Sequence, residues 1–204
     1  STQLKLVYVD DVVKEFIHVV QQKNKGVYTP KIEPEYSITL GELAKQLKDF
    51  RNCRSSLILE KVGIGLNRAL YSTFMSYLSP EQFSYPLSSY GDERGMFVEM
   101  LKTKDSGQFS FFTVHQDVTR GGHYHHSKTE KFFVIKGKAR FCFRHIITNE
   151  TYELFTSGDE PQVVDTIPGW THDITNVGDE EMVVMLWANE IFDRDNPDTV
   201  IAKV

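Results

Sequence analysis

From about residue 96 onward, the chain is built from short runs in which apolar and polar residues alternate. At least eight runs follow this pattern: MFVEM, GQFSFFTV, EKFFVIKG, ARFCFRHI, TYELF, QVVDTI, HDITNV and EMVVMLW. Turn-forming residues separate them, as in Asp105-Ser106-Gly107, Lys136-Gly137-Lys138 and Pro168-Gly169. Many short strands at regular spacing predict an antiparallel sandwich or barrel, so the chain is expected to be mainly β.

The first part of the chain has a different, mixed α and β pattern. A β-branched and aromatic run predicts a strand over residues 4–9, and the amphipathic residues after Asp10 predict a helix over 11–23. Thr39 followed by Glu42 is typical of a capping box, so a second helix should begin there. A further helix is expected over 63–77.

Residues 81–95 are rich in turn-forming residues and mark the expected boundary. We therefore predict one domain over residues 1–85 and a second over 86–204. The formal net charge of −5 argues against a nucleic-acid partner, because such domains usually carry a basic excess. The absence of a long apolar stretch and of a signal-peptide pattern argues against a membrane partner and favours the cytoplasm.

The chemistry is expected to lie in the segment GGHYHHSKTE, residues 121–130. His123 and His125 are two residues apart on a predicted strand, so both should point to the same face. Glu130 follows after a turn and can face the same interior. Downstream, the pattern P-G-x2-H-x3-N over 168–176 offers a fourth ligand from a tight turn.

Three neutral imidazoles and one carboxylate suit zinc, Fe(II), manganese or nickel and do not suit a soft thiolate site. The alternative interpretation is a solvated, histidine-rich surface turn. The full spacing H-x-H-x4-E-x6-G favours the metal site over that alternative. His126 has the opposite strand parity, which favours an outer or exposed position rather than a ligand role.

These segments resemble the two motifs of the cupin family. The first stretch matches closely, and the second differs in having Pro168-Gly169 where the family usually has P-x-G. The resemblance implies a double-stranded β-helix barrel. It also implies inward-projecting metal ligands at His123, His125, Glu130 and His172.

Two further segments resemble nucleotide-sugar 3,5-epimerases. Residues 92–99 match the family's D-x-R-G-x-F-x-E segment, and residues 120–124 match its R-G-x-H-Y segment. The resemblance implies substrate-binding roles for Arg94, Glu99 and Arg120. In metal-free members the histidine of the second segment is the base, whereas here His123 is the first expected metal ligand, and we favour the ligand role.

Over its whole length the chain is similar to CapF-type bacterial enzymes of capsule and O-antigen synthesis. LKLVYVDDVVKEF (4–16) and ITLGELAKQLKDFR (38–51) resemble the late part of extended short-chain dehydrogenases, and they precede the cupin segment. The family joins an NADPH-dependent reductase to a metal-dependent epimerase. No glycine-rich dinucleotide motif and no Y-x-x-x-K pair is present, so residues 1–85 would be a reductase remnant and NADPH is expected only in a longer, intact protein.

The resemblance implies C3 epimerisation of a UDP-2-acetamido-2,6-dideoxy-4-ketohexose, a precursor of N-acetyl-L-fucosamine, with zinc as the expected metal and a homodimer as the expected assembly. The base that moves the proton is not identified by the sequence, and the candidates are His126, Tyr124, Glu99 and Lys131. The alternatives are a non-catalytic sugar-binding cupin and a mononuclear iron oxygenase.

Overall fold

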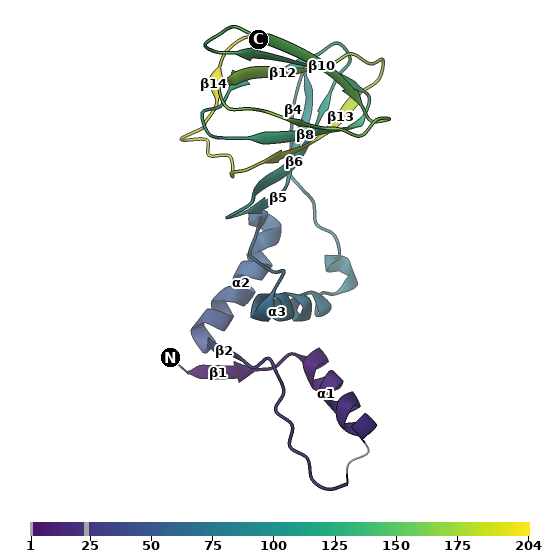
Figure 1. Cartoon of the computed structure of the whole chain (residues 1–204), viewed down its shortest axis with the longest axis vertical. Helices are drawn as coiled ribbons and strands as arrows, with labels where there is room; N and C mark the ends of the chain where they lie inside the picture. Colours follow the sequence, from purple (N-terminus) through teal and green to yellow (C-terminus); the bar gives the residue numbers. More distant parts are fainter. Residues whose placement is uncertain (1, 23–24) are drawn as a thin grey trace. The chain divides into compact units, whose positions relative to one another are not determined.

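The computed structural model describes residues 2–22 and 25–204, and these residues fall into two compact units. The N-terminal unit holds the described residues up to Ser55 together with Glu60–Ser84. The barrel unit holds Ser56–Leu59 and Tyr85–Val204. The strands labelled in the barrel unit and the helices of the N-terminal unit can be followed in Figure 1.

The N-terminal unit is a mixture of short strands and helices, as the sequence predicts. Its elements are β1 (Gln3–Leu6), α1 (Val9–Gln22), β2 (Tyr36–Thr39), α2 (Leu40–Ser56), α3 (Gly65–Ser76) and the 3-10 turn η1 (Pro80–Gln82). The expected strand over 4–9 was too long, because the helix already begins at Val9. The end of the helix expected at Lys23 lies outside the described residues.

The start of α2 confirms the predicted capping box. The backbone N–H of Glu42 donates to Thr39 Oγ1 (3.2 Å), and the backbone N–H of Thr39 donates to Glu42 Oε2 (2.9 Å). These reciprocal bonds satisfy two backbone donors at the helix terminus. Further along the helix, Phe50 is buried and its ring lies 5.1 Å from that of Tyr71 and 5.9 Å from that of Phe74 in α3.

Two mostly antiparallel sheets form the barrel unit. The smaller sheet has the order β10-β9-β12-β7-β14, and the larger has the order β11-β8-β13-β6-β5-β3, with β4 paired to β5. The one parallel pairing among the described strands joins β3 to β5, which places residues 56–59 in this unit. The strands are β3 (Ile58–Leu59), β4 (Ser89–Asp92), β5 (Gly95–Thr103), β6 (Gly107–Val114), β7 (Thr119–Tyr124), β8 (Glu130–Lys136), β9 (Lys138–His145), β10 (Thr151–Ser157), β11 (Val163–Asp165), β12 (Trp170–Asn176), β13 (Met182–Ala188) and β14 (Val200–Ile201).

Both sheets contribute to one hydrophobic core. Its buried residues alternate along the strands with outward-facing ones, as period-two patterns require. They are Phe112, Val114, Phe132, Val134, Ala139, Phe141, Phe143, Val164, Ile174, Met182 and Val184. The predicted mainly β, double-stranded β-helix fold is therefore confirmed. The origin of residues 1–85 as a reductase remnant stays a prediction.

No helix among residues 2–22 and 25–204 has the length and apolar character needed to cross a membrane.

Candidate metal centre

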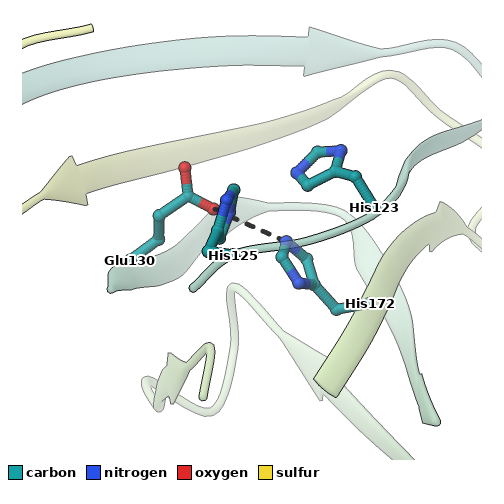
Figure 2. A group of neighbouring side chains, drawn as sticks. All are labelled: His123, His125, Glu130 and His172. Carbon is teal, nitrogen blue, oxygen red and sulfur yellow. Dashed lines mark hydrogen bonds and ion pairs between the residues drawn. The ribbon is translucent and has the colours of Figure 1, made fainter. Parts of the chain in front are cut away.

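The four residues that the sequence singles out lie together inside the barrel unit. His123 is on β7, His125 follows that strand directly, Glu130 begins β8, and His172 is on β12. One ligand atom from each of them lies within 4.8 Å of all the others. Figure 2 shows the three imidazoles and the carboxylate around one common space.

Strand pairing between β7 and β12 brings two of the imidazoles together. His172 is the register partner of His123, and their ring centroids are 4.7 Å apart. The register shifts directly after His172, where Gly121 adopts φ +100°. A Cβ on residue 121 would lie 2.7 Å from the carbonyl oxygen of His172. Glycine is therefore required for this close approach of the two strands.

The turn before β12 ties the second motif to the first. Gly169 adopts φ +81°, and its N–H donates to the carbonyl of His125 at 3.0 Å. The N–H of Trp170 donates to the carbonyl of Ile167 at 3.1 Å, which closes a tight turn. The Pro-Gly sequence thus delivers His172 to the cluster although it differs from the usual spacing of the cupin motif.

The donor set fits a divalent cation. His125 Nε2 lies 3.2 Å and His172 Nε2 lies 3.5 Å from the same carboxylate oxygen, Glu130 Oε2. Among the described residues, Nδ1 of the buried His172 has no hydrogen-bond partner, and Nε2 has no hydrogen bond shorter than its 3.5 Å approach to Glu130 Oε2. Buried polar groups are normally paired, because an unpaired one costs free energy. A cation bound at Nε2 would satisfy one of these two nitrogens.

The spacing of the donors agrees with this conclusion. In a six-coordinate site, two ligand atoms on opposite sides of the ion, each about 2.1 Å away, would lie about 4.2 Å apart. The four donors lie within 4.8 Å of one another, which is close to this value. The four residues can therefore surround one ion.

The electrostatics of the cluster favour a neutral His123 and an ionised Glu130. Burial and, to a smaller extent, the neighbouring His172 lower the pKa of His123 to about 4, while Glu130 opposes the shift. For Glu130, burial raises the pKa, but His125, His172 and Lys128 outweigh it and hold the pKa below its ordinary value. Neutral imidazole and ionised carboxylate are the forms that bind metal.

Acid should destabilise the metal-free protein through His123. Its pKa is near 6.5 when unfolded and about 4 when folded. The neutral form therefore contributes stability that is complete above pH 6.5 and is lost as pH falls toward about 4. Urea unfolding of the metal-free protein across this window should show a decline in stability that is shallower in His123→Gln. Identical pH profiles for the two proteins would contradict this assignment.

A cavity of about 220 Å³ opens onto the cluster and is called here the cluster cavity. Besides His123, Glu130 and His172, its lining includes Arg94 and Arg120. Both guanidinium groups contact Asp92: Arg94 Nε donates at 3.0 Å and Arg120 Nη2 at 3.3 Å. Within the described part of the chain, the buried Nε of Arg120 has no hydrogen-bond partner.

One carboxylate between two guanidinium groups leaves this side of the cluster cavity with a net positive charge. Hydrogen bonds from the side chain and backbone of Arg94 lower the pKa of Asp92, so Asp92 is ionised at neutral pH. Arginine is well suited to bind phosphate oxygens because its donors form a planar fork. The cavity can therefore hold an anionic group beside the cluster.

A second cavity of about 220 Å³, called here the lysine cavity, shares Glu130 with the first. Its lining includes Glu99, Gln108 and the buried Lys128, whose ammonium is 3.7 Å from Glu130 Oε1. Glu99 accepts hydrogen bonds from Lys102 (2.8 Å) and Gln108 (3.2 Å). The sequence analysis did not identify Lys128 as a residue of the site. Its position between the expected ligands His125 and Glu130 could have indicated that it lies close to them.

The other three candidate bases lie outside both cavities. Lys131 follows Glu130 on β8, so it points to the opposite face, where it is exposed and pairs with Asp165 at 2.5 Å. Tyr124 follows His123 on β7, and its ring lies 5.3 Å from the ring of the exposed His126. Neither cavity is lined by any of these three side chains. Of the four candidate bases, Glu99 is therefore the one that lines a cavity next to the cluster.

Comparison with known proteins finds relatives of this chain in polysaccharide biosynthesis. Residues 90–200 match the family described as Polysaccharide biosynthesis C-terminal domain. The chain is 60% identical over 204 residues to the UDP-2-acetamido-2,6-beta-L-arabino-hexul-4-ose reductase of Pseudomonas aeruginosa. The matched region covers all of this chain and 55% of that protein. This chain thus spans about half the length of that relative.

Solved structures of CapF agree with this relationship. CapF of Staphylococcus aureus, described as a capsular polysaccharide assembling protein, is 40% identical with a TM-score of 0.93, covering all of this chain and 60% of that chain. A structure of CapF with the inhibitor 3-isopropenyl-tropolone gives the same identity and TM-score over 59% of that chain. The chain therefore belongs to the polysaccharide biosynthesis C-terminal domain family and corresponds to the C-terminal part of CapF-type proteins.

Proposed function

We propose that the barrel unit is a metal-dependent epimerase that inverts C3 of a UDP-2-acetamido-2,6-dideoxy-4-ketohexose. The product would be a precursor of N-acetyl-L-fucosamine in capsular polysaccharide and O-antigen biosynthesis. The observation that carries the proposal is the buried cluster of three imidazoles and one carboxylate in a chain 60% identical to a reductase named for a 4-keto sugar nucleotide. In the intact protein we expect this step to be coupled to NADPH-dependent reduction at C4.

The reaction needs an acidic C3–H and a group that moves its proton. The C4 ketone of the sugar makes the C3–H acidic, because the resulting carbanion is an enolate. A bound divalent cation, for which we propose Zn²⁺, would stabilise the developing negative charge by several kcal/mol. A base takes the proton, and an acid returns one to the opposite face.

The chain's own residues supply binding and position. His123, His125, Glu130 and His172 would hold the cation, and Arg94 and Arg120 would bind the diphosphate of the nucleotide from the cluster cavity. Glu99 is the proposed proton-transfer group in the lysine cavity, where Lys102 and Gln108 orient its carboxylate. A cytoplasmic homodimer remains the expected state of the protein.

Solvent exchange at C3 tests the proposal directly. A UDP-2-acetamido-2,6-dideoxy-4-ketohexose incubated with the protein in D2O should gain deuterium at C3 without any nicotinamide. The rate should exceed that in buffer alone, because enolisation also occurs without a catalyst. The measurement is the loss of the C3 proton signal by NMR.

Two other outcomes would favour the alternatives. Protium retained at C3 while the nucleotide sugar is bound would indicate a non-catalytic sugar-binding barrel. Oxygen uptake by the Fe(II)-loaded protein in the presence of the sugar would indicate a mononuclear iron oxygenase. Either result would overturn the epimerase proposal.

A further inference from the structure

The segment after β13 returns to the loop that joins the first-motif ligands. At one end, Asn189 and Thr129 exchange hydrogen bonds: Asn189 N–H donates to the Thr129 carbonyl (3.1 Å), and Thr129 N–H donates to Asn189 Oδ1 (3.0 Å). At the other end, Asp198 contacts residues 125–128. The loop between His125 and Glu130 is therefore held from both ends by residues distant in sequence.

The carboxylate of Asp198 caps this loop. It accepts backbone hydrogen bonds from His126 (2.8 Å), Ser127 (2.7 Å) and Lys128 (2.8 Å), and a fourth from Ser127 Oγ (2.9 Å). The bond from the His126 backbone makes the largest contribution to lowering the pKa of Asp198, so the side chain is ionised at neutral pH. Hydrogen bonds to a charged acceptor are about twice as strong as neutral ones.

The backbone carbonyl of the same residue contacts a ligand. Asp198 O lies 2.5 Å from His125 Nδ1. Because a carbonyl oxygen only accepts, this contact requires a proton on Nδ1, and a neutral ring with that proton presents the lone pair of Nε2 to a cation. That nitrogen is the one 3.2 Å from Glu130 Oε2 in the cluster.

We infer that Asp198 is a positioning residue for the metal centre: its carboxylate fixes the loop between His125 and Glu130, and its carbonyl accepts a hydrogen bond from His125 Nδ1 and so orients the ring with Nε2 toward the cluster. Groups that orient a ligating histidine in this way typically change metal affinity by about 10–100-fold when they are lost. This inference rests on the proposed metal-dependent function.

Metal affinity of the whole chain gives the first test. Zinc dissociation constants, measured by competition with a chromophoric chelator, should be raised about 10–100-fold in Asp198→Ala. The zinc dissociation constant of Asp198→Asn should lie between those of the wild type and Asp198→Ala. The asparagine keeps one acceptor oxygen, but its amide NH2 would face backbone donors. Asp195→Ala is the matched control, since Asp195 is an exposed acidic residue of the same segment, and it should bind zinc as the wild type does. Wild-type affinity in both Asp198 variants, verified as folded by circular dichroism, would overturn the inference.

The hydrogen bond at His125 Nδ1 gives a second readout that needs no metal. In the metal-free wild type, 15N NMR should show a proton on His125 Nδ1 that the bond to the Asp198 carbonyl protects from exchange with solvent. In Asp198→Ala, or in Asp198→Asn if the alanine variant does not fold, the carboxylate no longer fixes this segment, so the protection should be lost. Unchanged protection would overturn the positioning role. Wild-type protein that binds no metal would instead contradict the proposed function, and the NMR result would then decide the positioning role by itself.

Discussion

Replacing His172 by alanine should remove the bound metal and lower the rate of deuterium exchange at C3 by roughly a thousandfold. The wild type is expected to carry close to one divalent ion per chain. The variant loses one of four donors that converge from separate strands. A loss of about 4 kcal/mol of enolate stabilisation corresponds to about three powers of ten in rate.

Metal analysis after chelator-free purification and the NMR exchange assay would measure both effects. His115→Ala serves as the matched control, because His115 is half exposed and contacts Glu181 at 3.5 Å outside both cavities. It should retain full metal content and exchange. A His172→Ala protein that binds its ion as tightly as the wild type would show that His172 is not a ligand.

Replacing Phe141 by alanine should lower the free energy of unfolding of the barrel unit by about 3–5 kcal/mol. Its side chain is fully buried and its ring lies 5.7 Å from that of Phe132 in the other sheet. Truncation removes apolar contacts and leaves a cavity between the sheets. The loss would be a large share of the stability of a typical domain.

Urea unfolding followed by tryptophan fluorescence would report on the barrel unit alone, since both tryptophans, Trp170 and Trp187, belong to it. Phe155→Ala is the control, because Phe155 is 61% exposed on the neighbouring strand β10. It should cost less than about 1 kcal/mol. Equal losses in the two variants would contradict the placement of Phe141 in the core.

The parts of the fold that could be predicted from sequence are those with local causes. Alternation of apolar residues predicted most barrel strands, and the spacing of Thr39 and Glu42 predicted a helix start, because each pattern acts over a few residues. The strand expected over 4–9 ran into the following helix, since strand propensity does not show where a helix begins.

The candidate site divides in the same way. His123, His125 and Glu130 lie in one short segment whose spacing carries the information, and the Pro-Gly turn places His172. Side chains alternate between the two faces of a strand. Applied to Tyr124 and Lys131, this alternation would have predicted that both point away from the cluster. Asp198 could not be found, because its contact with the 126–128 loop depends on how the chain returns after β13.

The pairing of β7 with β12 also bears on the order in which the protein assembles. His123 and His172 meet only when β12 pairs with β7, and strands β8 to β11 lie between these two strands in the sequence. Such non-local pairing is slow compared with local contacts. In a classical zinc finger, the ion drives a short chain to fold. Here we expect the opposite sequence of events, in which the barrel folds first and captures its ion afterwards, so that metal supply during synthesis would affect occupancy rather than folding yield.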